Sequence, residues 1–307
     1  MDKKNKMKKV TLSQEQMQYI MEMGLSCFKN CMHPPWYFYS PIFMIKEVKA
    51  REDAIWKGLE SLETEGIDLR SEEQVEYYNM LSETYFHEAP FSMEEQEGVR
   101  FHENTRFAYG DAMMLYAVIR HHKPKHIIEA GSGYSSAVML DTNEKFFNNE
   151  IKTTFVEPYP SSALDDVLKE EDRKNATVIE ECVQTVDLDV FSQLEAGDIL
   201  FIDSSHVSKT GSDVNFLFFD VFPKLPSGVL IHLHDIFHSF EYPKDWCYKG
   251  RQWNELYLLR AFLSHNNQYK INFFGHYLSC YQKQCASDAP KLTDAYLPTS
   301  SFWMEKL

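Results

Sequence analysis

The sequence has no hydrophobic run long enough to cross a membrane and no pattern of a secretory signal. A membrane-spanning helix needs about 20 consecutive apolar residues, and the longest apolar stretches, such as residues 37–45, are far shorter. Lysines 3, 4, 6, 8 and 9 make the N-terminus basic, but no apolar segment follows them as it does in a signal peptide. We therefore expect a cytoplasmic protein with a frayed, solvated N-terminus.

Paired cysteines and an excess of positive charge are missing too. The six cysteines, at positions 27, 31, 182, 247, 280 and 285, are scattered without Cys-x-x-Cys spacing, which predicts reduced thiols. The 46 acidic residues outnumber the 31 basic ones, and the net charge is −15. This balance argues against a broad nucleic-acid-binding surface. Small molecules or other proteins are the expected partners.

The sequence pattern changes near residue 100 and divides the chain into two parts. Residues 11 to about 100 carry helical periodicity and many charges, which predicts an α-helical accessory or lid region over residues 1–100. Its middle, residues 32–41, is rich in proline and aromatic residues. We favour a packing role for this segment over a substrate lid, and exposed aromatic residues of the region would suit a homo-oligomer surface.

Residues 101–307 read as one α/β domain, because apolar runs alternate with amphipathic segments. Strands are expected at 127–130, 153–156, 177–179, 199–203, 229–233 and 271–274, with a last edge strand at 300–304. Helices are expected to begin near Tyr134, Ser161, Asp187, Ser212 and Gln252; Ser212 or Asp213 would be an N-cap. The pattern predicts a Rossmann-like, doubly wound sheet.

The first of these strands breaks into a Glu-x-Gly-x-Gly turn formed by Glu129, Gly131, Ser132 and Gly133. The glycines can adopt positive φ and let the backbone approach a ligand, and the following helix would direct free N–H groups at it. A dinucleotide-binding turn would have a third glycine where this chain has Ser136. The turn therefore predicts a nucleotide-type ligand and weakens the case for NAD.

Four of the predicted strands end in an acid: Glu129, Glu157, Asp203 and Asp235. A single such acid is more simply a cap of the next turn or helix, but ligands of doubly wound sheets bind outside the carboxyl ends of the strands. Glu157 lies roughly 20 residues beyond the glycine turn, where a carboxylate can accept both hydroxyls of a ribose. Four acids in one sheet predict a ligand site there.

These motifs resemble class I S-adenosylmethionine-dependent methyltransferases over residues 107–274, particularly the bacterial group near the macrocin-type and catechol-type O-methyltransferases. The resemblance rests on the turn at 129–133, on Glu157, on Phe-Ile-Asp-Ser-Ser-His at 201–206 and on Asp235 after Gly228. It implies a seven-stranded sheet with one antiparallel strand near its edge.

The resemblance also implies the cofactor site. Gly131, Ser132 and Gly133 would lie beside the methionine part of S-adenosyl-L-methionine. Glu157 would bind its ribose, and residues 180–183 would flank its adenine. Glu129 would orient the turn, and Asp203 is a further candidate for cofactor binding. Asn104, Phe107 and Asp111 are candidates for a roof over the cofactor.

The catechol-type pattern has a metal-binding Asp after the fourth strand, a Lys three residues later and an Asp-Asn pair after the fifth. Here Asp203 and Asp235 keep both acids, but His206 stands at the Lys position and Ile236 at the Asn position. Two carboxylates with waters and a chelating substrate can hold Mg²⁺ or Mn²⁺, and His206 or His234 would add nitrogen for a softer divalent metal. Alternatively, neutral His206 is a general base on an acceptor hydroxyl.

Other polar residues have simpler interpretations. For Glu255 and Arg251, a position at the active-site mouth is one interpretation, and a solvated helix start is the one we favour. We expect His232 and His238 in structural or surface positions.

The sequence thus predicts an S-adenosylmethionine-dependent methyltransferase that acts on an oxygen of a small molecule, with Asp203, His206 and Asp235 at the acceptor. An NAD(P)-dependent oxidoreductase is the alternative, supported by the glycine turn and Glu157 but opposed by Ser136. A non-catalytic scaffold with the same fold is a third possibility, and the retention of all four strand-end acids speaks against it.

Overall fold

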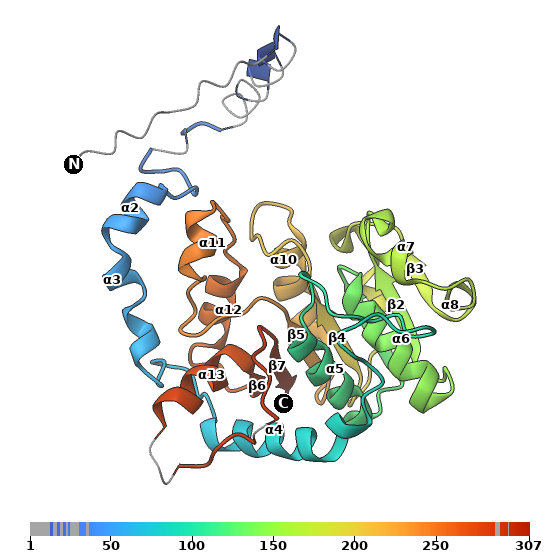
Figure 1. The fold of residues 1–307 in the computed structure, drawn as a ribbon. Helices are drawn as coiled ribbons and strands as arrows, with labels where there is room; N and C mark the ends of the chain where they lie inside the picture. The colour runs from blue at the N-terminus through green and yellow to red at the C-terminus, as the bar shows by residue number, and fades with distance from the viewer. Residues whose placement is uncertain are drawn as a thin grey trace, which may run out of the picture. The chain divides into compact units, whose positions relative to one another are not determined.

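The computed structural model describes residues 13, 14, 17, 18, 21, 22, 24, 31–34, 37–285, 289–293 and 295–307 (Figure 1). The basic run at residues 3–9 lies outside them. The contacts of the chain divide it into two compact units, residues 1–52 and 53–307, so residues 53–100 are joined to the larger unit. A functional division at residue 100 stays a prediction.

The smaller unit contains helix α2 (Ile45–Ala50), which has no buried residue. Before it, the rings of His33 and Tyr37 stack with their centroids 4.9 Å apart. Tyr37, Phe38 and Tyr39 are 50%, 89% and 68% exposed. These three side chains are not buried within their own unit, and the packing role of the segment stays a prediction.

The larger unit is built on a seven-stranded sheet in the order β3-β2-β1-β4-β5-β7-β6. Its strands are β1 (His126–Ala130), β2 (Lys152–Val156), β3 (Thr177–Ile179), β4 (Ile199–Ile202), β5 (Leu230–Leu233), β6 (Tyr269–Phe274) and β7 (Phe302–Lys306). Strands β1 to β5 pair in parallel, and β7 runs antiparallel to β5 and β6. The Rossmann-like class and the single antiparallel strand are confirmed.

The position of the last strand differs from the prediction. Residues 302–306 do not form an edge; they lie between β5 and β6, and β6 is the edge strand. The burial of Phe302, Trp303 and Met304, each at most 1% exposed, explains this position. Such a run of large apolar side chains is stabilised by neighbours on both sides.

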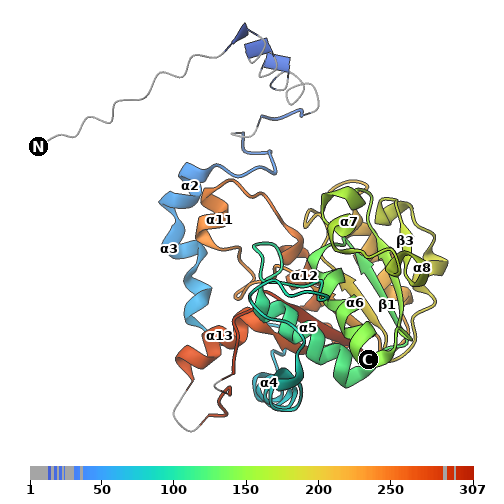
Figure 2. The same ribbon diagram turned by 45° about the vertical axis from the view of Figure 1, so that its right-hand side comes forward.

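Helices cover both faces of the sheet. On one face, α5 (Tyr109–His122) packs between α4 (Ser71–Tyr85) and α6 (Tyr134–Phe147), as Figures 1 and 2 show. Every residue of α5 from Gly110 to Ile119 is buried, so this helix is a central part of the core. The helix α6 starts directly behind the glycine turn at the end of β1.

The opposite face carries α10 (Asp213–Phe216), the π-helical turn η5 (Leu217–Val221) and α12 (Glu255–Leu263). The rings of Phe218 and Phe262 join η5 to α12, with centroids 5.5 Å apart. As predicted, Ser212 is the N-cap of α10; its side chain accepts a hydrogen bond from the amide of Asn215.

Short elements complete the unit. They are α3 (Glu52–Ile55), which begins at the boundary, η1 (Lys57–Glu60), η2 (Phe86–Glu88), η3 (Pro160–Ser162), α7 (Leu164–Val167), α8 (Asp172–Asn175), η4 (Val183–Thr185), α9 (Leu188–Phe191), η6 (Phe222–Lys224), α11 (Lys244–Tyr248) and α13 (Gly275–Gln284).

A buried arginine ties the loop before α5 to this framework. The Arg100 guanidinium, whose side chain is 4% exposed, lies 2.8 Å from Asp141 of α6, 2.7 Å from Asp172 of α8 and 2.7 Å from Glu144. Asp141 also accepts hydrogen bonds from the amides of Arg100 and Phe101. The loop that leads into α5 is thereby fixed to α6 and α8.

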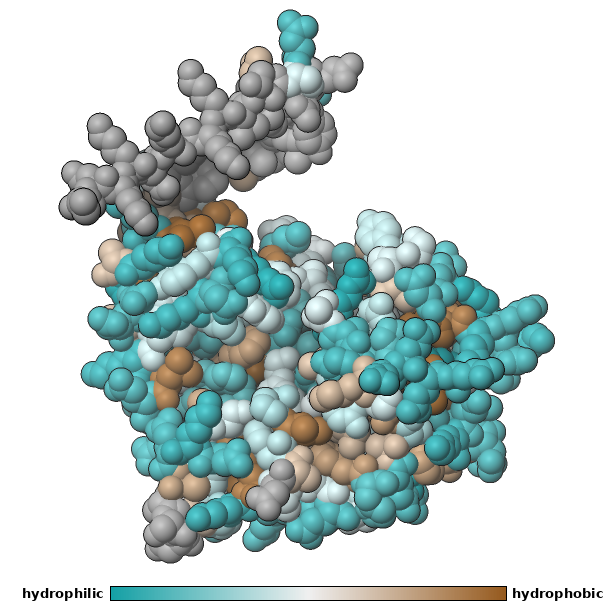
Figure 3. All heavy atoms as spheres, in the orientation of Figure 1, coloured by the Kyte–Doolittle hydropathy of each residue, from teal (hydrophilic) through white to brown (hydrophobic). Residues whose placement is uncertain are grey.

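The surface fits the acidic composition. On the face drawn in Figure 3, hydrophilic residues dominate and hydrophobic ones form only small groups. Cys31, Cys182, Cys247, Cys280 and Cys285 are free thiols, as predicted. Within the described ranges, no helix has the length and apolar character needed to cross a membrane.

Candidate active site

Two adjoining cavities lie at the carboxyl ends of β1, β2 and β4. The smaller, about 130 Å³, is lined by residues of the glycine turn and by Arg106 and Phe107. The larger, about 470 Å³, extends past Pro158, Tyr159, Cys182 and Val183. Gly131, Glu157 and Asp203 line both cavities. These three residues therefore mark the junction of the two cavities, which together form one groove.

Gly131 allows β1 and β4 to end close together. Its φ is +80°, and a Cβ atom at this position would collide with the carbonyl oxygen of Asp203. Its amide donates to Val156 O at 3.0 Å. Gly133 differs from the prediction of positive φ, because its φ is 174°, which is ordinary extended backbone. Only Gly131 uses the left-handed freedom of glycine in this turn.

Glu157 lies where the two cavities join. Its carboxylate accepts hydrogen bonds from the amides of Ser132, at 3.1 Å, and Tyr159, at 2.7 Å. Each carboxylate oxygen keeps a free lone pair in this arrangement, since each accepts only one of these bonds. The position suits the predicted contact with vicinal hydroxyls.

Glu129 lines neither cavity. It is completely buried, and its carboxylate accepts hydrogen bonds from the hydroxyls of Ser135 and Ser136. Ser136 also accepts a bond from the amide of Gly133 at 3.0 Å. The residue that replaces the third glycine of a dinucleotide fingerprint thus links the turn to Glu129.

The buried Glu129 gives a pH prediction. Burial raises its pKa to about 8. The contribution of the neutral carboxyl group to the stability of the folded protein is therefore fully present below about pH 4.5, the ordinary pKa, and is lost as the pH rises toward 8. The Glu129→Gln variant should lack this loss, and its stability relative to the parent should rise from pH 5 to 8 by up to about 1.4 kcal/mol per pH unit. Urea unfolding across this range measures it.

The exposed Glu150 provides the matched control. Glu150→Gln should leave the pH dependence of the parent unchanged. If Glu129→Gln has the same pH dependence as the parent, Glu129 is ionised in the folded protein.

The predicted acceptor residues come together beyond β4 and β5. Asp203 lies 3.2 Å from His206 Nε2 and 3.6 Å from His234 Nδ1. Asp235 lies 3.6 Å from His234 Nδ1 and 3.9 Å from His206 Nε2. His206 and Asp235 have positive φ values of 58° and 57°. Such conformations are uncommon for these residue types and occur often at functional sites.

Two further acids contact the ring nitrogens of His206 and His234 that do not face Asp203 and Asp235. Glu255 Oε2 lies 2.9 Å from His206 Nδ1, and the amides of Asn254 and Glu255 donate to His206 O. The expected solvated position of Glu255 is therefore wrong: it is fully buried, because the first turn of α12 packs against His206. Sequence reasoning had no signal for this pair, since 49 positions separate the two residues.

Asp111 is the equivalent partner of His234. Asp111 Oδ2 lies 3.6 Å from His234 Nε2, and its other oxygen accepts from the amides of Ser300 and Ser301 before β7. Among the three roof candidates, Phe107 lines the smaller cavity. Asp111, on α5, instead contacts the cluster of predicted acceptor residues. This acceptor cluster consists of Asp203, His206, His234 and Asp235.

Comparison with known proteins agrees with this geometry. A family model described as a methyltransferase domain matches residues 128–236, from within β1 to the residue after Asp235. The chain belongs to the class I S-adenosylmethionine-dependent methyltransferases. The methyltransferase is also 37% identical to an uncharacterized protein of Archaeoglobus fulgidus over 182 residues. These residues make up 58% of this chain and 81% of that protein. The two proteins belong to one family.

Solved structures include more distant neighbours of the methyltransferase. The methyltransferase PaMTH1 of Podospora anserina, bound to SAH, has 14% identity and a TM-score of 0.42 over 86% of this chain and 97% of that one. The O-methyltransferase TomG of Streptomyces achromogenes, in complex with SAM, has 11% identity and a TM-score of 0.41 over 76% and 98%. The fold assignment rests on the strand order and the family model.

The acids control the charge of both imidazoles in the methyltransferase. Burial lowers the pKa of His206, but the hydrogen bonds to Asp203 and Glu255 outweigh it and raise this pKa well above its usual value. Burial also lowers the pKa of His234, and Asp203 and Asp235 raise it to about 10. Both rings are therefore positively charged at neutral pH, with a proton on each nitrogen. The general-base hypothesis requires a neutral His206.

The same geometry bears on the predicted metal. Each carboxylate oxygen of Asp203 and Asp235 faces an imidazole nitrogen, and a protonated nitrogen has no lone pair for a metal. In the part of the methyltransferase that the structure describes, no group of three or more His, Cys, Asp or Glu side chains is arranged to hold an ion. The side chains as placed do not fit the predicted site.

The remaining histidines named above are structural, as expected. His232 is buried and stacks on Phe201, with centroids 3.8 Å apart, and His238 is bonded to Ser61 O at 2.7 Å. Neither ring lines either cavity of the groove.

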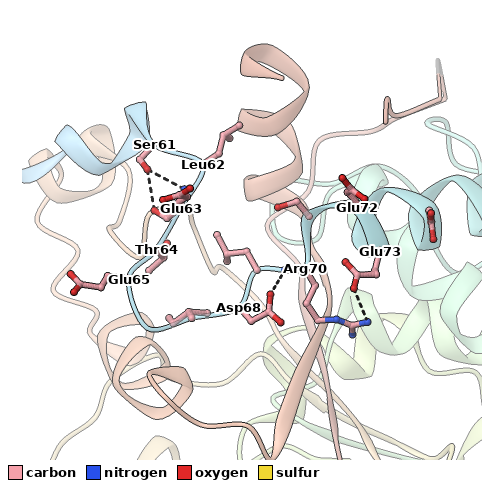
Figure 4. A pocket seen from close by; sticks show the side chains of 13 residues that line it. Ser61, Leu62, Glu63, Thr64, Glu65, Asp68, Arg70, Glu72 and Glu73 are labelled. Carbon is pink, nitrogen blue, oxygen red and sulfur yellow. Dashed lines mark hydrogen bonds and ion pairs between the residues drawn. The ribbon is translucent and has the colours of Figure 1, made fainter. Parts of the chain in front are cut away.

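A larger cavity, about 1110 Å³, lies along residues 61–76. Figure 4 shows its acidic side chains, including Glu63, Glu65, Asp68 and Glu72, and the ion pair of Arg70 with Glu73 at 3.5 Å. It contains none of the predicted site residues. The predicted cofactor residues Gly131, Glu157 and Asp203 line the groove at the strand ends instead.

Proposed function

We propose that this methyltransferase transfers the methyl group of S-adenosylmethionine to an oxygen atom of a small molecule. The observation that carries the proposal is the position of Asp203. It lines both cavities of the groove and also belongs to the cluster with His206, His234 and Asp235. A cofactor in the groove and an acceptor at the cluster would therefore meet beside one carboxylate.

The groove fits this cofactor. Its larger cavity, about 470 Å³, is within the range of about 300–1,000 Å³ typical of small-molecule sites. Glu157 offers carboxylate oxygens for ribose hydroxyls, and the close backbone approach at Gly131 leaves room at the strand ends. Arg106, at the smaller cavity, offers a cation for the carboxylate of the methionine part. When bound, S-adenosylmethionine supplies an electrophilic methyl group.

The acceptor cluster suits a hydroxyl group. A hydroxyl must lose its proton as its oxygen attacks, so the reaction needs a proton acceptor and stabilisation of negative charge. Asp235 provides a carboxylate for the proton, since burial raises its pKa. Burial also raises the pKa of Asp203, but His234 and His206 outweigh it and lower that pKa to about 2, so Asp203 is the weaker base. The imidazolium groups of His206 and His234 provide N–H donors and positive charge near the oxygen, and Glu255 and Asp111 hold these rings in place.

The remaining parts of the proposal concern partners and ions. We propose a small-molecule acceptor in the cytoplasm and no nucleic-acid partner, in keeping with the net charge of −15. A divalent ion such as Mg²⁺ or Mn²⁺ at the cluster stays a prediction. No step of the proposed reaction passes through it.

Calorimetric titration of S-adenosylhomocysteine tests the cofactor site. Glu157→Ala should weaken binding by about 2 kcal/mol, the scale of charge-assisted hydrogen bonds, because it removes the carboxylate at the junction of the cavities. Glu171→Ala, which removes an exposed acid outside the groove, should leave the affinity unchanged. Equal affinities of the parent and the Glu157 variant would remove Glu157 from the site.

The same instrument separates the alternatives. NAD⁺ is titrated in parallel with S-adenosylhomocysteine, and each ligand is titrated with and without Mg²⁺ or Mn²⁺. Binding of NAD⁺ without binding of S-adenosylhomocysteine would contradict the proposal, and binding of neither would favour the scaffold hypothesis.

A further inference from the structure

The loop between α11 and α12 holds an arginine on an aromatic surface. The guanidinium carbon of Arg251 lies 3.9 Å from the ring centroid of Trp246 and 4.7 Å from that of Trp253. The two indoles meet edge to face, with centroids 5.5 Å apart. Two contacts of this kind fix the position of a side chain that is otherwise exposed.

This aromatic surface borders the acceptor cluster. The ring of Trp253 lies 4.3 Å from the imidazole of His206, and the ring of Trp246 lies 5.0 Å from that of Phe237, two residues beyond Asp235. The surface therefore connects Arg251 with the ends of β4 and β5. A planar ring placed against it would reach both the cluster and the guanidinium.

The charge of Arg251 is not compensated by the protein. Throughout the described ranges, Arg251 has no ion pair and no side-chain hydrogen bond, although the chain has 46 acidic residues. Arg100, Arg120 and Arg173, by contrast, each pair with a carboxylate. The indoles hold the guanidinium by cation–π contacts, which leave its N–H groups available to a ligand. These groups match the two oxygens of a carboxylate in a bidentate pair.

We propose that Arg251 binds a carboxylate of the methyl acceptor, and that the acceptor class is a phenol that carries a carboxylic acid. The indoles of Trp246 and Trp253 would contact the aromatic ring, and the hydroxyl would face His206 and Asp203. This inference rests on the proposed function and adds the chemical class of the acceptor to it. Arg251 is then a specificity-determining residue.

A pair of probes, one with a carboxylate and one with a neutral amide in its place, tests the inference. Calorimetry on protein saturated with S-adenosylhomocysteine would compare 3,4-dihydroxybenzoate with 3,4-dihydroxybenzamide, which differ mainly in the charge of one group. We expect the acid to bind at least tenfold more tightly than the amide. In Arg251→Met, which keeps an apolar stem on the indoles, this ratio should fall to about one. Arg260→Met, an exposed arginine on α12, should keep the ratio of the parent.

The outcomes separate this inference from the proposed function. Equal binding of acid and amide by the parent, binding of neither, or an unchanged ratio in Arg251→Met would each overturn the role of Arg251. Binding of S-adenosylhomocysteine is measured first on every variant, and its retention within twofold shows that the fold and the cofactor site are intact. Failure of that first titration in the parent would instead contradict the proposed function.

Discussion

Gly131→Ala is expected to abolish measurable binding of S-adenosylhomocysteine and to lower the free energy of unfolding by about 2–4 kcal/mol. The reason is a collision with backbone and not with a flexible side chain. A Cβ atom at position 131 would overlap the carbonyl oxygen of Asp203, so the ends of β1 and β4 would have to separate. This separation would displace Asp203, which lines both cavities of the groove.

Gly197→Ala is the matched control for this variant. Gly197 has a φ of +89°, similar to the +80° of Gly131, but a Cβ atom at position 197 would have no heavy atom within 4 Å. The control therefore carries the cost of a left-handed alanine, about 1–2 kcal/mol, without the collision. Urea unfolding and calorimetry on both variants isolate the effect of the collision. Equal losses of stability in the two, with S-adenosylhomocysteine binding retained in Gly131→Ala, would contradict the prediction.

Arg100→Met is expected to destabilise the protein by about 3–5 kcal/mol, the usual cost of removing one partner of a buried ion pair. The substitution leaves Asp141 and Asp172, which are both buried, without their common cation. The side chain of methionine fills part of the volume but offers no donor. Chemical denaturation at neutral pH measures the loss.

Arg173→Met tests whether burial is responsible for this cost. Arg173 pairs with Asp165, but the two side chains are 47% and 37% exposed, and exposed pairs contribute about 0–1 kcal/mol. We expect a change within about 0.5 kcal/mol for this control. A similar loss in both variants would mean that the contacts of the Arg100 stem, and not its charge, stabilise the loop before α5.

Local sequence pattern was sufficient to predict the parallel half of the sheet. Strands β1, β4 and β5 are short and fully buried, so each appears in the sequence as a mainly apolar run with an acid in it or shortly after it. The prediction that Asp203 and Asp235 come together followed from the shared carboxyl edge of parallel strands and from the resemblance to the catechol-type pattern.

The same reasoning failed where the structure depends on contacts between distant segments. The position of β7 inside the sheet depends on pairing with β5 and β6, which the order of elements along the chain does not reveal. Glu255 looked like an ordinary acid in the first turn of a helix, where a carboxylate is stabilised by the helix dipole. Only the packing of α12 shows that it is buried against His206.

The glycine turn combines both situations. The sequence predicted correctly that Gly131 needs positive φ, but the same prediction was wrong for Gly133. Two glycines in one turn look alike in a sequence. The close approach of Asp203 to Gly131, a contact between two strands, is what distinguishes them.

The insertion of β7 between β5 and β6 also has a consequence for the order in which the protein is made. The ribosome produces β6 before β7, so β6 leaves it with no neighbour to pair with, and the edge of β5 is open at the same time. Open strand edges of this kind are prone to pair with other chains. The segment that closes both edges also brings Ser300 and Ser301 to Asp111. The hydrogen bonds that hold Asp111 beside His234 thus form only after the segment of β7 has been made.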